Sequence, residues 1–362
     1  LPAYSDCDLS DIGAALEGYA QFCAEQIVPL SQVGDTQGAR FDKGRVTMPE
    51  GDARAYARFV EMGWQALIHP AEHGGIGLPR AVGAAAVEML NAADMSFGLC
   101  PLLTDGAIEA LLLTGSDTQK ATYLGPLIEG RWSGTMNLTE PQAGSDLGRV
   151  ATRAVQRGDG TYGITGTKIF ITYGAHDLTE NIIHLVLART PDAPPGPKGL
   201  SLFIVPQKLV NPDGTVGAAN AVNCVSIEHK LGVRASPTAV LDYDDATGFL
   251  VGDENCGLEY MFVMMNAARF SVGVQAIAIA QRAYQRALAY ARYRLQSPPV
   301  NSQSKDAVPI LEHPDVRRMH LRMRTLTQRG RAMAAATAAP LDIAHHRPDP
   351  DTVALPASMV PR

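Results

Sequence analysis

The sequence has little of what usually marks a nucleic-acid-binding or membrane-spanning protein. Its 362 residues include 31 lysines and arginines against 37 aspartates and glutamates, giving a formal net charge of −6, without a basic block or an aromatic-basic stripe. We therefore do not expect nucleic-acid binding, because lysines and arginines would be needed to neutralise phosphates. No apolar run approaches the roughly 18 residues of a membrane span, so no stable membrane insertion is expected.

Cysteine and histidine patterns give no sign of a disulfide framework or a metal site. The cysteines are odd in number and lack paired spacing: Cys7, Cys23, Cys100, Cys224 and Cys256. A reducing cytoplasm is the simplest location for such a chain. His313 and the pair His345-His346 have no partner at metal-ligand spacing, so no metal is expected. No signal peptide is visible, although the chain opens on Leu1 rather than methionine.

Apolar residues recur at steps of three and four over the first part of the chain, which is typical of helices that bury one face. The spacing predicts helices over residues 9–27, 52–62, 81–93, 105–113 and 117–128. Pro29 is expected to end the first of them. Gly115 is a plausible C-cap, and Ser116 or Asp117 could begin the next helix.

The period changes to two after residue 132, which indicates strands. Alternating residues on both sides of the turn 157–160 predict a hairpin. Further strands are expected over residues 182–188, 200–205, 222–227 and 238–243. Two long helices, 257–295 and 314–345, should then complete the chain.

These patterns predict an α+β protein of three consecutive domains. Residues 1–131 should form an N-terminal α-helical domain, and 132–250 an antiparallel β-barrel or sandwich. Residues 251–362 should form the first part of a C-terminal helical bundle.

Two motifs bear most directly on function. The first is Thr-Met-Asn-Leu-Thr-Glu-Pro-Gln-Ala-Gly-Ser-Asp-Leu at 135–147, and the second is Gly-Thr-Lys-Ile-Phe-Ile-Thr at 166–172. In the first, Thr139 and Ser145 bracket a turn that could point backbone N–H groups and hydroxyls at one ligand. In the second, Phe170 offers a flat apolar face, and Thr172 should project from the same side of its strand. An ordinary hairpin with a polar loop has the same spacing.

Taken together, the two motifs resemble the flavin-binding signature of the acyl-CoA dehydrogenases. The resemblance extends over essentially the whole chain, including Gly74-Gly-Ile-Gly77, residues 250–257 and Arg269. It is nearest to the 3-methylmercaptopropionyl-CoA dehydrogenase-like branch, on the evidence of residues 227–232, 257–262 and 312–319. It implies the acyl-CoA dehydrogenase fold, in which a β-barrel domain lies between two helical domains.

The activity implied by the resemblance is FAD-dependent oxidation of an acyl-CoA thioester to the trans-2-enoyl-CoA, as in fatty-acid β-oxidation. An electron-transfer flavoprotein would accept the electrons. Two other functions stay open: a non-catalytic subunit that binds flavin or CoA, and a flavin oxidase or monooxygenase on the same fold.

The family's site residues can be placed position by position. The resemblance puts flavin contacts at Met136, Leu138, Thr139, Gly144, Ser145, Phe170 and Thr172, with Ser145 also near substrate. Arg294 and Gln296 match residues that reach the flavin of a neighbouring subunit, which implies a homodimer or tetramer. Asn266 and Arg269 match contacts to CoA, although Asn266 replaces a more usual aspartate. Arg294 could instead cap a helix, and Phe170 could be barrel core.

The family's catalytic base is missing from both familiar positions. No glutamate precedes a Gly-Thr pair late in the chain, and Ala268 stands where a minority of relatives carry the base before the arginine matching Arg269. We interpret Glu259 and Glu312 as structural residues. Three explanations compete: a longer enzyme whose base lies beyond Arg362, a short subunit that pairs with a partner carrying the base, and a fold member without dehydrogenase activity.

Overall fold

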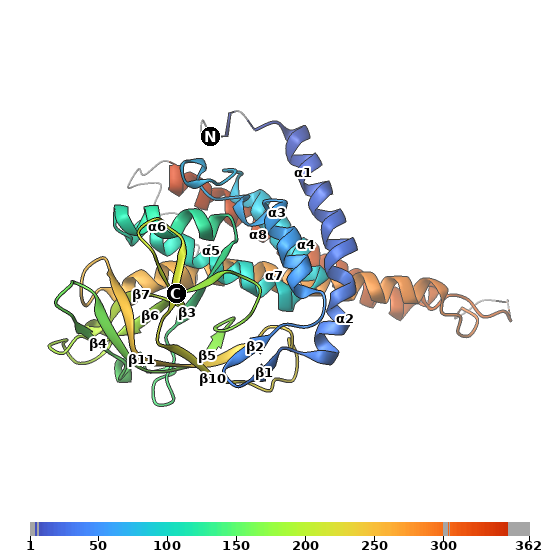
Figure 1. Cartoon of the computed structure of the whole chain (residues 1–362). Coiled ribbons are helices and arrows are strands. Elements are labelled where there is room, and N and C mark those ends of the chain that lie inside the picture. Colours follow the sequence, from blue (N-terminus) through green and yellow to red (C-terminus); the bar gives the residue numbers. More distant parts are fainter. Residues whose placement is uncertain (1–3, 6, 300–302, 304, 347–362) are drawn as a thin grey trace. The chain divides into compact units, whose positions relative to one another are not determined.

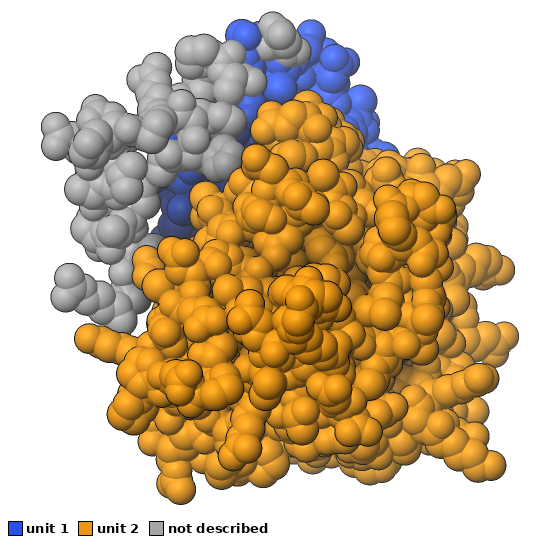
Figure 2. Space-filling model, turned by 60° about the vertical axis from the view of Figure 1, so that its left-hand side comes forward, with its two compact units in different colours: residues 1–20, 79–92, 270–362 blue, residues 21–78, 93–269 orange. Residues whose placement is uncertain are grey.

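The computed structural model describes residues 4, 5, 7–299, 303 and 305–346, and Figure 1 labels its elements. The chain divides into two compact units, which Figure 2 colours separately. Unit 1 is made of Leu1–Ala20, Pro79–Ala92 and Phe270–Arg362, and unit 2 of Gln21–Leu78 and Ala93–Arg269. Each unit joins segments that are distant in the sequence, so each is described by itself. The three consecutive domains stay a prediction.

Helices dominate both ends of the chain, and strands lie between them. The α-helices are α1 (Leu9–Phe22), α2 (Val28–Gln37), α3 (Asp52–Glu61), α4 (Arg80–Ala93), α5 (Met95–Thr114), α6 (Asp117–Ile128), α7 (Gly257–Tyr293) and α8 (Pro314–His346). The short helices are η2 (Cys23–Ile27), η3 (Trp64–Ala66), η4 (Ala71–His73), η5 (Leu147–Arg149), η6 (Pro197–Gly199) and η7 (Ile310–Glu312).

The strands follow the predicted order but include several that the sequence patterns did not indicate. They are β1 (Arg40–Asp42), β2 (Arg45–Thr47), β3 (Trp132–Asn137), β4 (Arg153–Gln156), β5 (Tyr162–Thr172), β6 (Asn181–Ala188), β7 (Ser201–Pro206), β8 (Lys208–Val210), β9 (Val216–Ala219), β10 (Val222–Ile227) and β11 (Thr238–Val251). The short hairpins β1–β2 and β8–β9 were not predicted, because three- or four-residue strands carry too little alternation to detect. The mixture of helices and mainly antiparallel strands confirms the predicted α+β class.

The prediction that Pro29 ends the first helix is wrong. The backbone stays helical from α1 through the π-helical segment η2 into α2, where Pro29 lies in the first turn. Val28 N–H, just before the proline, donates to the Cys23 carbonyl five residues back, which is the hydrogen-bond spacing of a π-helix. The π-helical register immediately before it therefore absorbs the break that a proline would otherwise impose.

Helix α5 is longer than predicted, because its sequence lacks a polar face. The predicted start was residue 105, whereas the helix begins at Met95, where the N-cap Asp94 accepts hydrogen bonds from Ser96 N–H and Phe97 N–H. A helix that is apolar all round shows no amphipathic period and is usually buried. The predicted C-cap at Gly115 is confirmed, and Ser116 is the N-cap of the next helix, where it forms a capping box with Gln119.

The main sheet belongs to unit 2 and has the strand order β3-β6-β7-β11-β5-β4, with β10 pairing to β11. Its pairs are antiparallel except for β3 and β6, which run parallel with Trp132 opposite Asn181. The expectation of a wholly antiparallel sheet is corrected at this one pair. The β4–β5 hairpin separates β3 from β6 along the chain, so the two strands have a long enough connection to lie in the same direction.

Helix α5 packs against strand β3 (Figure 1). A Cβ added at Gly134 would lie 2.4 Å from the Cβ of Ala107, so no larger side chain fits there without movement. Trp132 and Leu111 are fully buried in the same apolar cluster. Full burial of one large apolar side chain contributes about 1.5–3 kcal/mol, which makes this face of β3 a strong anchor.

In unit 1, polar side chains join α4 to the two C-terminal helices. Arg331 of α8 pairs with Glu88 of α4, and Gln275 of α7 donates to Asn91 Oδ1 of α4 over 2.7 Å. Asp342 of α8 is 5% exposed and accepts a hydrogen bond from Arg80 N–H over 3.0 Å. These contacts tie the C-terminal helices to a segment some two hundred residues earlier in the sequence.

Two helices among the described residues, α5 and α7, are long and apolar enough to cross a membrane by length and composition alone. Within α5, 67% of the apolar window is buried in the protein, as expected of a core helix, against 28% within α7. The expectation of no stable membrane insertion stays a prediction.

Candidate active site

Strand β3 presents a different chemistry on each face. Met136 and Leu138 are half-buried against the apolar cluster that includes α5. Ser133, Thr135 and Asn137 instead make side-chain hydrogen bonds on the opposite face. The strand is therefore fixed from both sides where the first motif begins.

A buried chain of hydrogen bonds lies on the face of β3 that carries Thr135 and Asn137. Tyr243 O–H donates to Asn137 Oδ1 (3.0 Å), and Asn137 Nδ2–H donates to Thr135 Oγ1 (2.9 Å). Thr135 Oγ1 lies 2.7 Å from His184 Nδ1, and His184 Nε2 lies 3.1 Å from Gln207 Oε1. The amide oxygen of Gln207 can only accept, so His184 carries its proton on Nε2 and Nδ1 accepts from Thr135.

Burial keeps two histidines of unit 2 neutral. It lowers the pKa of His184 to about 4 and, together with the nearby His184, lowers the pKa of His176 to about 3. Desolvation disfavours the imidazolium ion, which has no carboxylate partner among the described residues. Neither histidine was singled out from the sequence, because nothing local marks a histidine that will face a buried hydroxyl.

The first motif leaves β3 through a tight turn. Glu140 N–H donates to the Ala143 carbonyl over 2.9 Å, and Ala143 N–H donates back to the Glu140 carbonyl over 3.0 Å. Gly144 and Ser145, which follow, are exposed. The turn predicted between Thr139 and Ser145 is thus present, with its tip accessible to a ligand.

The second motif contains a bulge at Phe170. Lys168 pairs with Leu241 and Ile171 pairs with Ala239, so two residues of β5 lie opposite one residue of β11. Phe170 has a φ of 61° and is 58% exposed. A bulky residue in the left-handed region costs on the order of 1–3 kcal/mol, and bulges commonly redirect a side chain near a functional site. Its exposure excludes the barrel-core role for Phe170.

The tertiary structure brings the two motifs together. Ile169 N–H, next to Phe170, donates to the Thr139 carbonyl over 2.9 Å. Thr172 lies two residues further along β5 and is half-buried, as is Thr139. No hydrogen bond joins either threonine hydroxyl to any residue that the structure describes, so both are available to a ligand.

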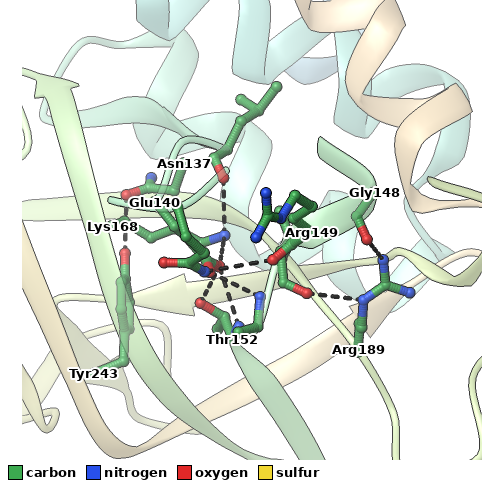
Figure 3. Close-up of polar contacts among 12 residues, drawn as sticks. Asn137, Glu140, Gly148, Arg149, Thr152, Lys168, Arg189 and Tyr243 are labelled. Atoms are coloured by element: carbon green, nitrogen blue, oxygen red, sulfur yellow. Dashed lines mark hydrogen bonds and ion pairs between the residues drawn. The ribbon is translucent and has the colours of Figure 1, made fainter. Parts of the chain in front are cut away.

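A buried ion pair joins the residues next to this hydrogen bond, Lys168 before Ile169 and Glu140 after Thr139. Lys168 Nζ is 2.8 Å from Glu140 Oε1, and their side chains are 0% and 3% exposed (Figure 3). Burial lowers the pKa of Lys168 to about 8, so the amine stays mainly protonated at pH 7 beside the carboxylate. Lys168 and Glu140 lie within the two motifs, although no role was predicted for either.

The chemistry of the Thr139–Thr172 region fits a flavin. An exposed aromatic ring can pack on a flat heterocycle, and free hydroxyls and the N–H groups of an exposed turn can donate to ring carbonyls or phosphate oxygens. These groups are Thr139, Gly144, Ser145, Phe170 and Thr172.

The predicted CoA contacts lie in the N-terminal half of α7. Arg269 Nη1 donates to Asn266 Oδ1 over 2.8 Å, and the guanidinium is 5.5 Å from the centroid of the Phe262 ring. Both predicted residues are exposed. An exposed guanidinium can bind phosphate oxygens, so the pair is chemically suited to the role assigned by resemblance.

No acidic side chain stands at the expected base position on α7. Ala268 is half-buried against the apolar cluster. Glu259 in the first turn of α7 and Glu312 in η7 are both exposed.

Arg294 and Gln296 are adjacent at the end of α7, in unit 1. Arg294 donates to Gln296 Oε1 over 2.9 Å and to the Leu295 carbonyl over 2.6 Å. His313 lies 2.6 Å from the Gln296 carbonyl oxygen, to which its Nε2–H donates. Both predicted residues are exposed and could meet another subunit.

Within the described ranges, no group of three or more histidine, cysteine, aspartate or glutamate side chains could hold a metal ion. The side chains of His345 and His346 lie outside the described part of the chain.

The chain belongs to the acyl-CoA dehydrogenase family. Models of that family's N-terminal, middle and C-terminal domains match residues 13–131, 135–246 and 255–358. The chain is 66% identical over 349 residues to the 3-methylmercaptopropionyl-CoA dehydrogenase of Ruegeria pomeroyi, covering 96% of this chain and 59% of that protein. It is also 32% identical over 280 residues to a probable acyl-CoA dehydrogenase of Bacillus subtilis, covering 76% of this chain and 67% of the relative. The predicted family and branch are confirmed.

Solved structures share the fold. A structure described as the electron transferring flavoprotein of Acidaminococcus fermentans has a TM-score of 0.75 and 26% identity, over 92% of this chain and 79% of its own. An acyl-CoA dehydrogenase from Bacillus anthracis complexed with FAD has a TM-score of 0.76 and 22% identity, over 98% of this chain and 55% of its own. The predicted FAD dependence is confirmed at the level of the family.

The chain spans about 59% of the length of the Ruegeria pomeroyi relative. The activity, substrates and partners of the whole protein are therefore proposals.

Neutral buried histidines should make unit 2 sensitive to acid. Between pH 6.5 and about 4, an unfolded His184 takes up a proton while the folded one does not, so stability falls as pH falls through this window. One pKa unit corresponds to about 1.4 kcal/mol, so the full effect is about 3 kcal/mol. We expect His184→Gln, which cannot titrate, to flatten the fall in thermal midpoint between pH 7 and 4.5. His229→Gln, at an exposed histidine, should leave the slope unchanged.

The strain at Phe170 can be separated from its contact with a ligand. Phe170→Gly relieves the left-handed backbone, whereas Phe170→Ala keeps it, so the glycine variant should be more stable by about 1 kcal/mol. Both variants should bind FAD at least about tenfold more weakly, since both lose the ring. Thermal unfolding and FAD titration of apoprotein measure the two effects. Equal stability of the two variants would contradict the strain.

Proposed function

We propose that this protein catalyses FAD-dependent α,β-dehydrogenation of an acyl-CoA thioester, giving the trans-2-enoyl-CoA. The observation that supports it best is the junction of the two motifs, where Thr139 and the bulged Phe170 are joined through the bond from Ile169 to the Thr139 carbonyl. Membership of the acyl-CoA dehydrogenase family supports the reaction type.

In this proposal the flavin ring lies against Phe170 and receives hydrogen bonds from the hydroxyls of Thr139 and Thr172. Met136 and Leu138 contribute backbone contacts, while Gly144 and Ser145 approach the pyrophosphate, with Ser145 also near substrate. When bound, FAD accepts the hydride from the β carbon. The protein's own contribution is to orient the thioester and to remove the α proton.

The CoA moiety is proposed to bind Asn266 and Arg269. The existing hydrogen bond from Arg269 to Asn266 and the contact of the guanidinium with Phe262 hold the cation in place. A positioned guanidinium gives phosphate oxygens charge-assisted hydrogen bonds. This would locate the substrate before chemistry begins.

The substrate is proposed to be a short acyl-CoA, with 3-methylmercaptopropionyl-CoA as the first compound to examine. The support is the 66% identity to the Ruegeria pomeroyi enzyme that bears this name. Electrons are proposed to pass to an electron-transfer flavoprotein, in keeping with the family resemblance. Roles in β-oxidation and a cytoplasmic location are proposals of the same kind.

The proton acceptor is proposed to be neither Glu259 nor Glu312, because both are exposed. A carboxylate supplied by another segment or another subunit would then serve. Arg294 and Gln296 are proposed to reach the flavin of a neighbouring subunit, which requires a homodimer or larger homo-oligomer.

A second candidate function is a non-catalytic subunit that binds flavin or CoA. The observation that favours it is Ala268, a methyl group at the position where some relatives carry the base. Such a protein would bind FAD without reducing it.

Anaerobic titration separates these functions. The protein expressed from its complete gene and loaded with FAD should lose its visible flavin absorbance on addition of 3-methylmercaptopropionyl-CoA or butyryl-CoA. A flavin that stays oxidised with thioesters of every chain length would favour the non-catalytic subunit. Glu259→Gln and Glu312→Gln should bleach as fast as the wild type, because neither carboxylate is the proposed base.

The Thr172 hydroxyl can be tested without activity. Thr172→Val keeps the branched shape and removes one donor, which should weaken FAD binding by about fivefold, since a hydrogen bond contributes about 1 kcal/mol. The thermal midpoint of the apoprotein should stay unchanged, because no described residue bonds this hydroxyl. Thr165→Val, at an exposed position of the same strand, is the matched control. Equal affinities of the two variants would remove Thr172 from the site.

A further inference from the structure

The loop between β3 and β4 is closed by one buried carboxylate. Glu140 stands at the loop's start, and its two oxygens accept hydrogen bonds from Ala151 N–H (2.8 Å), Thr152 N–H (3.1 Å) and Thr152 O–H (2.5 Å) near its end. Gln142 Nε2–H also donates to Glu140, over 2.5 Å. Figure 3 shows Glu140 beside Thr152. One side chain therefore joins the two ends of the segment that contains Gly144 and Ser145.

Lys168 holds this carboxylate and the residue before the turn at the same time. Its Nζ donates to Glu140 Oε1 over 2.8 Å and to the Leu138 carbonyl over 3.0 Å. The next residue of β5, Ile169, donates its N–H to the Thr139 carbonyl. Three consecutive residues of the first motif are thus attached to two consecutive residues of the second.

Arg189 supports the same loop from its far side. It donates to the carbonyls of Gly148 over 2.8 Å and Val150 over 2.8 Å, and to that of Gly196 over 2.7 Å. Figure 3 shows Arg189 and Lys168 approaching the loop from separate positions. Lys168 therefore binds the backbone before the exposed tip, and Arg189 binds the backbone after it.

The ionised state of Glu140 fits this arrangement. Burial alone would raise the pKa of this carboxyl, but Lys168 and the hydrogen bonds from Thr152 and Ala151 outweigh burial and hold it below its usual value. Burial of an ion pair is weak evidence for a gain in stability, because desolvation offsets the attraction and an apolar pair of similar volume often replaces it without loss. We therefore infer that such a pair serves to select one conformation of the loop and does not serve mainly to raise the free energy of unfolding.

We propose that Lys168 and Glu140 are positioning residues, whose buried ion pair fixes the turn carrying Thr139, Gly144 and Ser145 in its binding geometry before the cofactor arrives. The role rests on the proposed function, in which this turn contacts FAD. Ordering one loop residue costs roughly 1–2 kcal/mol of conformational entropy, so a loop fixed in advance binds more tightly than one ordered by the ligand.

The test is a variant that removes both charges together. Lys168→Met alone would leave Glu140 buried without its partner, and Glu140→Gln alone would leave Lys168 buried without its partner, so the double variant K168M/E140Q is the probe. Both substitutions keep the approximate side-chain shapes. Hydrogen exchange of the apoprotein is followed at Ala151, Thr152 and Ile169, and at the amides of β6 and β7 as an internal reference.

We expect these three amides of the double variant to exchange at least about tenfold faster while β6 and β7 keep their protection, because loss of the carboxylate frees only local bonds. FAD should bind at least about tenfold more weakly, and the visible circular dichroism of the bound flavin should change. Arg131→Met is the matched control, since it breaks the exposed pairs of Arg131 with Glu129 and Glu180 beside the start of β3. It should change none of these measurements.

Two results would overturn the inference. One is a folded double variant whose loop exchange and FAD affinity equal those of the wild type. The other is a loss of protection spread evenly over unit 2, which would make the pair merely structural. Wild-type protein that fails to bind FAD would refute the proposed function alone, since the exchange measurements need no flavin.

Discussion

The candidate site depends on the hydrogen bonds that the backbone carbonyls accept just after β3 ends. The Leu138 carbonyl is bound by the Lys168 amine and the Thr139 carbonyl by Ile169 N–H, so β5 receives the end of β3. An unpaired buried carbonyl would cost about 1–3 kcal/mol. The same contacts place the backbone of Thr139 against Ile169, the residue before Phe170.

The remaining structure of unit 2 keeps β3 in that position. Gly134 allows α5 to approach the strand closely on one face, and the hydrogen-bond chain through Thr135 and His184 occupies the other. Strand β3 therefore cannot shift without opening a cavity against α5 or breaking the buried hydrogen bonds of Thr135. The loop tip at Ser145 is therefore an accessible segment on a fixed base, which is the arrangement that ligand-binding loops generally require.

The ligand contacts predicted from the sequence remain predictions, and the sequence patterns did not indicate the buried residues that hold them in place. Thr139, Phe170 and Thr172 belong to motifs whose residue types match a ligand directly. Lys168 and His184 gain their roles from partners such as Glu140 and Gln207, which lie 28 and 23 residues away along the chain. A charged residue in a strand is normally read as solvent-facing, so nothing local indicated that Lys168 would be completely buried.

The sequence by itself indicated the family, through the resemblance of its two motifs. It also determined the α+β class and the order of most helices and strands, because periodicity and turn chemistry are local properties. It also showed that Ala268 carries no carboxylate. Only the tertiary structure decided that Phe170 lies in a strained bulge, that β3 runs parallel to β6, and that Lys168 pairs with Glu140. Those features depend on contacts with residues that are distant in the sequence. The neighbouring residues in the chain do not indicate a register shift or a buried charge.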